Sequence, residues 1–209
     1  MATAASAAAS VGWKELLCTS LKKNKSLRNA TYVQVATVRP NGRPANRTVV
    51  FRGFLWDSER LTFVTDTRSD KVEEVAGNPY CEVAWYFPNS REQYRIQGTL
   101  DIIGASCDDS KLAKARVSAW KNMSDAGRTQ FAWPQPGLPR PDPEDKSPYD
   151  LPPPPADGPV LDAFSLVVLD PYAVDYLSLK GNLRKSFQRG EAADGGAGGL
   201  PWSEVDINP

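Results

Sequence analysis

The chain has 209 residues, and its 25 lysines and arginines balance 25 aspartates and glutamates, so its formal net charge is zero. This length suits one domain, and the balanced charge argues against nucleic acid as the main partner, which needs a basic surface. No stretch approaches the roughly 18 apolar residues of a membrane-spanning helix, so we expect a globular protein that binds neither nucleic acid nor membrane.

The sequence contains no histidine. This excludes Ser-His-Asp and Cys-His hydrolases, histidine-ligated zinc and haem, and a histidine general base. The three cysteines, Cys18, Cys81 and Cys107, are far apart without a CxxC spacing, so neither a metal site nor a disulfide framework is predicted. We expect Cys81, which lies in an apolar run, to be buried. Sparse cysteines fit a reducing compartment, which we take to be the cytoplasm, with an organelle left open.

Residues 1–10 are rich in alanine and serine but lack the basic residues of a secretory signal or a transit peptide, and we expect a flexible tail there. Residues 11–209 are expected to form one domain. Apolar periodicity, alternation and turn residues predict its elements. In chain order these are a helix at 12–24, strands at 30–38, 47–56 and 61–65, a helix at 70–75, strands at 80–87 and 92–104, a helix at 108–123, strands at 163–169 and 173–179, and a closing strand at 202–207 after a Gly-rich tip at 190–199.

Regular alternation of strands and helices is absent, so this series favours a small closed β-barrel with peripheral helices over a parallel sheet. A proline-rich insertion interrupts it: 11 of the 26 residues from 134 to 159 are proline, including 152–155. Such a segment predicts polyproline II or irregular structure at the surface. The run at 152–155 is either an SH3 or WW ligand or, as we favour, part of a structured excursion. A loop of this length is also a candidate active-site lid.

Cationic and hydroxyl side chains gather around one strand end and the helix start that follows it. The set consists of Arg47, Arg52, Thr65, Ser69, Lys71, Gln93 and Arg95. Ser69 is an N-cap residue, and free N–H groups at a helix start favour an anion, to which Arg47 adds a fork suited to phosphate. Arg47 and Arg52 are five residues apart, so alternation puts them on opposite faces unless a bulge intervenes. Taken singly, each residue is better explained as a solvated residue at a strand edge or helix flank.

This region resembles the pyridoxamine 5′-phosphate oxidase family, the FMN-binding split barrels. The family's R-x-V-L-L-K strand matches residues 47–52 (RTVVFR), and its Y-T-N…S-R-K turn matches 64–71 (VTDTRSDK). Its R-Q-V strand matches 92–94 (EQY), the late E-F-W strand matches 174–177 (VDYL), and the W-x-x-x-x-L-x-P terminus matches 202–209. The resemblance covers most of the chain outside the proline-rich insertion.

The resemblance implies a mainly β fold with peripheral helices, a small closed antiparallel split barrel that binds FMN at the interface of a homodimer. The residues expected to hold FMN are Arg47, Val49, Val50, Arg52, Thr65, Ser69, Lys71 and Gln93, with Arg47, Lys71 and Ser69 on its phosphate. The residues expected to bind a phosphorylated pyridine substrate are Trp120, Arg128, Arg184 and Lys185. The flavin would carry the chemistry, so no catalytic side chain and no metal is expected, which accounts for an enzyme without histidine.

The chain also departs from the family pattern. Asp70 stands in place of the arginine of S-R-K, with Arg68 as a candidate to replace its charge. Leu177 replaces an aromatic residue that packs on the flavin, and Ser186 replaces a substrate-binding histidine. Three functions follow: an FMN-dependent oxidase that converts pyridoxamine or pyridoxine 5′-phosphate to pyridoxal 5′-phosphate, an FMN-dependent oxidoreductase acting on another small substrate, and a non-catalytic FMN-binding protein. We favour the first.

Overall fold

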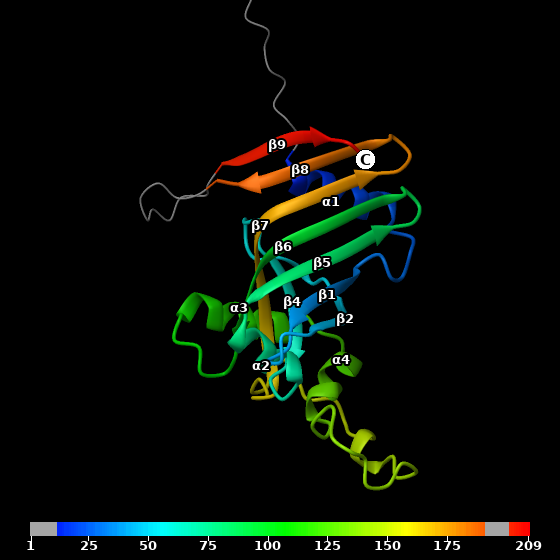
Figure 1. The fold of residues 1–209 in the computed structure, drawn as a ribbon. Coiled ribbons are helices and arrows are strands. Elements are labelled where there is room, and N and C mark those ends of the chain that lie inside the picture. The colour runs from blue at the N-terminus through cyan, green and yellow to red at the C-terminus, as the bar shows by residue number, and fades with distance from the viewer. Residues whose placement is uncertain (1–11, 191–200) are drawn as a thin grey trace, which may run out of the picture. The chain divides into compact units, whose positions relative to one another are not determined.

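The computed structural model describes residues 12–190 and 201–209, so the tail expected at 1–10 and most of the Gly-rich tip lie outside the described residues. Its elements are shown in Figure 1. They are α1 (Trp13–Lys23), β1 (Tyr32–Val38), β2 (Pro44–Val50), β3 (Gly53–Phe54), β4 (Leu61–Asp66), α2 (Asp70–Gly77), β5 (Tyr80–Phe87), β6 (Glu92–Ile103), α3 (Ser110–Lys121), α4 (Asp125–Thr129), the 3₁₀ helices η1 (Gln130–Ala132) and η2 (Ser147–Tyr149), β7 (Phe164–Ser178), β8 (Leu183–Arg189) and β9 (Trp202–Ile207).

The strands form one sheet in the order β2-β1-β5-β6-β7-β4-β3, and β8 pairs with both β7 and β9. The pairs β1–β2, β3–β4, β4–β7, β7–β8 and β8–β9 are antiparallel. This confirms the mainly β class with few helices. Among the described residues, the strand order has free ends at β2, β3 and β9, so it does not establish the closed barrel that the sequence predicted.

Two compact units divide the described residues. The first unit contains 12–31, 84–96, 172–190 and 201–209, and the second unit contains 32–83 and 97–171. The strands β5, β6 and β7 each contribute residues to both units.

In the first unit, α1 buries one face, formed by Trp13, Leu17 and Ser20. Their spacing of four and three residues places them on one side of a helix, as the sequence predicted. The Trp13 ring meets Trp202 of β9 edge-on, with 5.6 Å between ring centroids. Apolar contact therefore fixes the helix to the sheet of its own unit.

The same face of α1 covers a buried carboxylate, Glu92 of β6. The Ser20 hydroxyl donates to Glu92 at 2.7 Å and the Tyr176 hydroxyl donates to it at 2.9 Å. Lys23 adds an ammonium group at 3.2 Å. Burial raises the pKa of Glu92, but hydrogen bonds from its neighbours outweigh burial and lower the pKa below the ordinary value. Glu92 is thus held ionised within the core of the first unit.

In the second unit, the strand predicted at 47–56 is interrupted. β2 ends at Val50 and β3 begins at Gly53, whose φ of 123° lies in the region that favours glycine. The Arg52 N–H donates to the carbonyl of Thr62 at 2.9 Å, so the chain stays close to β4 across the break. The alternation that separates Arg47 from Arg52 therefore stops before Arg52.

The two strands predicted at 163–169 and 173–179 form a single strand, β7. Pro171 lies in the interval between the two predicted strands, and proline lacks the N–H needed in a central strand. In the structure, β7 pairs with β4 up to Leu169 and with β8 from Ala173 onward. Pro171 lies between these two pairings, where its missing N–H costs no bond to either strand.

The proline-rich insertion has no regular element among residues 134–159 except η2, as the sequence predicted. Its run at 152–155 lies against the helices, because Arg128 Nε donates to the carbonyl of Pro154 at 2.8 Å and Trp120 Nε1 to that of Pro155 at 3.4 Å. Two carbonyls of the run are therefore bound within the chain, which favours the structured excursion over a free SH3 or WW ligand.

Across residues 12–190 and 201–209, no helix is long and apolar enough to cross a membrane. In the same residues, no group of three or more histidine, cysteine, aspartate or glutamate side chains is placed to hold a metal ion. Cys81 is buried, as predicted, and burial raises the pKa of its thiol to about 12.

Candidate functional site

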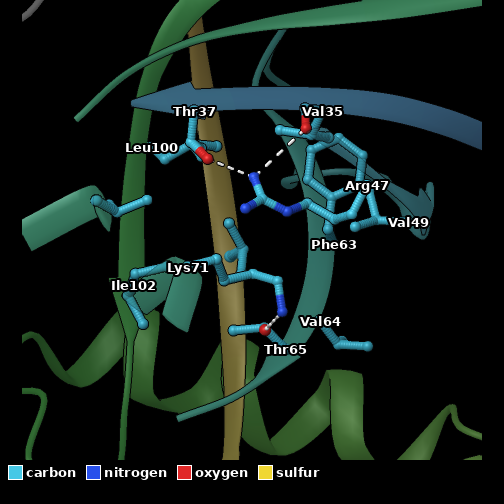
Figure 2. A pocket seen from close by; sticks show the side chains of 12 residues that line it. Val35, Thr37, Arg47, Val49, Phe63, Val64, Thr65, Lys71, Leu100 and Ile102 are labelled. Atoms are coloured by element: carbon cyan, nitrogen blue, oxygen red, sulfur yellow. Dashed lines mark hydrogen bonds between the residues drawn. The ribbon is translucent and has the colours of Figure 1, made fainter. Parts of the chain in front are cut away.

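Lys71 of α2 is the centre of a polar cluster at the end of β4. Its ammonium group donates to the Thr65 hydroxyl at 2.8 Å and to the Ser69 hydroxyl at 3.0 Å; Figure 2 shows Lys71 reaching towards Thr65. Ser69 occupies the N-cap position, yet its side chain does not cap the helix and donates instead to the carbonyl of Asp66 at 2.7 Å. The first N–H groups of α2 are thus left without the capping bond that Ser69 predicted.

Arg47 of β2 is oriented by a buried carboxylate. Its Nη2 donates to Glu74 Oε2 at 2.6 Å and its Nη1 donates to the Thr37 hydroxyl, which itself donates to Glu74 at 2.6 Å. Only 4% of the Glu74 side chain is exposed, compared with 23% of Arg47. Burial raises the pKa of Glu74, but hydrogen bonds from Thr37 and Arg47 outweigh it and lower the pKa. The ionised carboxylate of Glu74 therefore holds the Arg47 guanidinium in place from its buried side.

The ammonium of Lys71 lies close to the guanidinium of Arg47 in a partly dehydrated setting. Burial lowers the pKa of Lys71 from its ordinary value, and the positive charge of Arg47 lowers it further. Both effects penalise the charged form of lysine. A bound anion would reverse this penalty, so Arg47, Thr65, Ser69 and Lys71, which we call the anion cluster, are suited to a ligand with negative charge.

The anion cluster opens onto a pocket of about 550 Å³ in the second unit. Its lining comes mainly from β2, the end of β4, α2 and residues 130–138. We call residues 130–138 the pocket wall. The lining residues are Arg47, Thr48, Val49, Val50, Arg52, Val64, Thr65, Asp66, Lys71, Met123, Gly127, Gln130, Phe131, Trp133, Pro134, Gln135, Pro136, Gly137, Leu138 and Tyr149.

Two smaller cavities adjoin the same cations. One, of about 210 Å³, is lined by Arg47, Ser69, Asp70, Lys71, Pro136 and Gly137, so the pocket wall also faces the start of α2. The other is a narrow apolar crevice, seen in Figure 2, in which Val35, Val49 and Phe63 lie around the stem of Arg47. Arg47 and Lys71 line both cavities, so they lie where the polar part and the apolar part of a ligand would meet.

Most residues expected to hold a cofactor come together here. Six of them line the larger pocket: Arg47, Val49, Val50, Arg52, Thr65 and Lys71. Ser69 lines the smaller one. The break after β2 brings Arg47 and Arg52 to one pocket despite their spacing. Gln93 lies on β6 in the first unit and is not part of this lining.

The residues expected to bind a substrate phosphate are placed differently. Trp120 is fully buried and meets the Phe164 ring edge-on at 5.1 Å between centroids. Arg128 is buried, bonded to the carbonyls of Pro154 and Met123 and paired with Asp125. Both residues are therefore occupied inside the second unit and neither lines the pocket.

Arg184 and Lys185 lie on β8 in the first unit and are paired with carboxylates. Arg184 donates to Asp175 at 2.7 Å, and Lys185 pairs with Glu204 and Asp206. These ion pairs already offset the positive charges that a substrate phosphate would use.

Arg68 does not replace the charge lost at Asp70. Its guanidinium donates to both carboxylate oxygens of Asp66, at 2.9 and 2.7 Å, and to the carbonyls of Phe131 and Trp133. It lines neither the larger nor the smaller pocket. Asp70 itself borders the smaller one.

Sequence reasoning missed Glu74 and the pocket wall. Glu74 follows Lys71 by three residues, which puts both on one side of α2, but its burial and its bond to Arg47 leave no trace in the sequence. The insertion was predicted as a candidate lid, but the sequence did not show that its residues 134–138 line the pocket. Together, two cations, two hydroxyls and a helix start form a donor set for a phosphate group, and the adjoining aromatic and apolar lining suits a flat ring.

Comparison with known families agrees with this chemistry. Residues 10–104 match the family model described as pyridoxamine 5′-phosphate oxidase, FMN-binding domain. A protein of Arabidopsis thaliana named pyridoxine/pyridoxamine 5′-phosphate oxidase 2 is 40% identical over 197 residues, covering 94% of this chain and 96% of that protein. A protein of the same name from Ralstonia nicotianae is 32% identical over 104 residues, 48% of each chain.

Solved structures give the same relationship. A pyridoxamine 5′-phosphate oxidase-related, FMN-binding protein from Nostoc punctiforme superposes with a TM-score of 0.87 at 42% identity, covering 97% of this chain and 100% of that one. PhzG from Burkholderia lata, solved with tetrahydrophenazine-1-carboxylic acid, has a TM-score of 0.68 at 18% identity, covering 94% of this chain and 90% of that one. The similarity to PhzG shows a shared fold and nothing further.

Proposed function

Because this chain belongs to the pyridoxamine 5′-phosphate oxidase family of FMN-binding proteins, we propose that it binds FMN and oxidises pyridoxamine or pyridoxine 5′-phosphate to pyridoxal 5′-phosphate. The observation that carries the proposal is the pair formed by Arg47 and Lys71 at one end of a pocket of about 550 Å³. Among the described residues, the partly dehydrated ammonium group of Lys71 donates to two hydroxyls, at 2.8 and 3.0 Å.

Arg47, Ser69 and Lys71 hold the phosphate of FMN in this proposal, and Thr65 orients the ammonium group of Lys71. Glu74 keeps the Arg47 fork in place without facing the ligand, since its carboxylate is buried behind the guanidinium. A hydrogen bond to a charged group contributes about 1.5–3 kcal/mol, so each of these contacts matters to affinity.

FMN, when bound, would supply the redox chemistry of this proposal, namely hydride uptake from the substrate C4′ at flavin N5 and reoxidation by dioxygen to give hydrogen peroxide. The protein binds and orients. Val49 and Val50 of β2 give the pocket apolar lining, and Trp133 and Tyr149, whose rings meet edge-on at 5.6 Å between centroids, add aromatic lining. Arg52 is exposed at the pocket and supplies a cation for a negatively charged part of the substrate.

A second copy of the chain completes the site in this proposal, as the resemblance implies. In the first unit, one sheet face carries Leu177, Val205 and Ile207, of which Val205 is 57% exposed. Leu177 pairs with Arg184, and Arg184 pairs with Ile207, so the side chains of Leu177 and Ile207 lie on one face of the sheet. Val205, two residues before Ile207, lies on the same face, and α1 covers the opposite face. The expectation that Gln93 contacts FMN then becomes a contact from the partner chain. Closure of the sheet into a split barrel stays a prediction.

The test starts with cofactor loading. The Lys71→Met variant should weaken FMN binding about ten- to hundredfold, because a charge-assisted contact to phosphate is lost. Flavin fluorescence during titration of the apoprotein gives the dissociation constant. Lys114→Met, which removes an exposed lysine of α3, serves as the matched control and should bind FMN like the parent. Equal affinity of the Lys71→Met variant and the parent would refute the site.

The reaction is tested by the visible spectrum of FMN-loaded protein under anaerobic conditions. Adding pyridoxamine 5′-phosphate should bleach the flavin band, and air should restore it with release of hydrogen peroxide. A flavin band that stays unchanged with both pyridoxamine and pyridoxine 5′-phosphate would contradict the oxidase and leave an FMN-binding protein.

One observation favours a second candidate, an FMN-dependent oxidoreductase that acts on a substrate without a phosphate group. Arg128, Arg184 and Lys185 are occupied by carbonyls or carboxylates, which leaves Arg52 as the lining cation outside the anion cluster. The two candidates separate on pyridoxamine offered with and without its 5′-phosphate. A phosphate preference of about a hundredfold or more supports the first, whereas near-equal rates support the second.

A further inference from the structure

The proline-rich insertion is short of hydrogen-bond donors, because each proline brings a carbonyl without an N–H group. Buried side chains supply the missing donors. Arg128 donates to the carbonyl of Pro154 at 2.8 Å and Trp120 donates to that of Pro155 at 3.4 Å; just beyond the insertion, Arg116 donates to the carbonyls of Leu161 and Phe164. Arg128 also pairs with Asp125, so its guanidinium binds a carbonyl of the insertion and a carboxylate together. The insertion is therefore hydrogen-bonded to buried side chains of the second unit and forms part of its fold.

Arg68 makes the same kind of contact at the pocket. Its Nη2 donates to the carbonyl of Trp133 at 3.0 Å and to that of Phe131 at 3.4 Å, while Asp66 holds the guanidinium through both carboxylate oxygens. Gln135 returns the contact by donating to the carbonyl of Arg68 at 3.4 Å. Three residues of the pocket wall are thus bonded to one residue of the loop between β4 and α2.

That loop also joins parts of the anion cluster, because it contains Ser69 and connects Thr65 of β4 with Lys71 of α2. Arg68 immediately precedes Ser69, and Asp66 immediately follows Thr65. The hydroxyls of Thr65 and Ser69 both accept from Lys71. The distance between the anion cluster and the pocket wall therefore depends on the guanidinium of Arg68, although Arg68 lines neither cavity.

We propose that Arg68 is a positioning residue that holds the pocket wall at a fixed distance from the anion cluster, and so sets the affinity for the substrate without binding phosphate itself. Its planar fork is the reason arginine is needed: Nε and Nη2 together engage Asp66, and Nη2 also reaches two carbonyls. Lysine, a single point charge, reproduces the charge but not this geometry. The part of the inference that concerns substrate affinity rests on the proposed function.

The experiment compares Arg68→Gln and Arg68→Lys with the parent, using Arg43→Gln as the control. Arg43 is exposed in the turn between β1 and β2 and lines neither cavity, so this control removes one charge without touching the wall. Lys146 is the only lysine or arginine between residues 129 and 162 that is not followed by proline, so trypsin has one site in the insertion. We expect trypsin to cut after Lys146 about tenfold faster in both Arg68 variants, and at the parental rate in the control.

Ligand measurements separate positioning from direct binding. For the apoprotein, the affinity for inorganic phosphate should stay within about twofold of the parent in both Arg68 variants, because Arg47, Ser69 and Lys71 are intact. For the FMN-loaded enzyme with pyridoxamine 5′-phosphate, KM should rise about tenfold while kcat stays within about twofold.

Three results would overturn the inference: a loss of phosphate affinity as large as that of Lys71→Met, full restoration by Arg68→Lys, or unchanged trypsin cleavage with unchanged KM. The first would make Arg68 an anion ligand, and the second would make its charge sufficient. Trypsin cleavage and phosphate binding do not require the oxidase reaction. A chain that shows the predicted cleavage but no turnover would therefore refute the proposed function and leave the positioning role standing.

Discussion

At the residue scale, the buried carboxylates of this chain are held ionised by specific donors. Glu74 is bonded to Thr37 and Arg47, and Glu92 to Ser20 and Tyr176. Both carboxylates have lowered pKa values even though burial alone raises the pKa of each. A buried charge persists only where such bonds compensate for lost hydration. Glu74 serves the site, whereas Glu92 serves the core of the first unit.

The role of Glu92 in stability can be tested by pH. Its folded-state pKa lies below the ordinary 4.5, so its stabilising contribution is full above that value and is lost as pH falls through the lowered pKa. Glu92→Gln should therefore lower the free energy of unfolding by about 2 kcal/mol at pH 7 and by much less at pH 3. Urea unfolding at both pH values measures the difference. Glu144→Gln, at an exposed position, should change neither value, and an equal loss for Glu92→Gln at both pH values would contradict this account.

Sequence brought Arg47, Thr65, Ser69 and Lys71 together as a candidate set because their residue types suit an anion and the family resemblance assigns them to FMN, and their role stays a prediction. It could not predict which charges were already paired. Arg128 was a plausible phosphate ligand by type, yet in the structure its donors meet carbonyls of the proline-rich insertion. Pairing of this kind depends on distant segments, so local pattern does not contain it.

At the element scale, most strands were predictable, but β8 at Leu183–Arg189 and the continuity of the strands were not. The strands predicted at 80–87 and 202–207 match β5 and β9, because alternation and flanking turn residues define them. The prediction failed at β7, which runs through Pro171, and at 47–56, which breaks before Gly53. In both places the outcome depends on which neighbouring strand pairs with the chain, and periodicity along one strand does not contain that information.

One close approach between elements gives a test of the fold of the second unit. A Cβ atom added at Gly98 of β6 would lie 2.5 Å from the carbonyl oxygen of Asp170, which belongs to the backbone and cannot rotate away. Gly98→Ala should therefore lower the free energy of unfolding by about 2 kcal/mol. Gly77, the last residue of α2, has no atom within 4 Å of such a Cβ, so Gly77→Ala should leave stability unchanged or raise it by about 0.5 kcal/mol. Thermal or urea unfolding compares the two, and equal effects would mean that the contact at Asp170 relaxes without cost.

At the scale of the whole molecule, a single chain leaves part of the expected site unexplained. Gln93 belongs to the first unit, and the pocket is lined by the second. Family resemblance predicted that partner residues complete the cofactor site, and no pattern within one sequence reveals which face meets the partner. The sheet face of Leu177, Val205 and Ile207 is our candidate because its apolar side chains are register-aligned and partly or fully exposed.

This candidate face predicts how a charge would affect assembly. Val205→Lys should weaken self-association at least tenfold, because a lysine without a partner would have to be buried in the interface. Sedimentation velocity over a range of protein concentrations measures the change. Val117→Lys places the same charge on α3, where Val117 is 39% exposed, and should assemble like the parent. A parent that is monomeric at all concentrations, or a Val205→Lys variant that assembles normally, would contradict this interface.

If Lys71 holds the phosphate of FMN as proposed, its lowered pKa makes cofactor loading a proton-linked reaction. In alkaline solution part of the free protein carries Lys71 uncharged, and a phosphate group placed against it restores the ammonium form, so binding draws a proton from the buffer. The heat released on loading would then vary with the ionisation enthalpy of the buffer, and affinity would fall as the solution becomes more alkaline. Calorimetry in two buffers of matched pH would count that proton without any measurement of turnover.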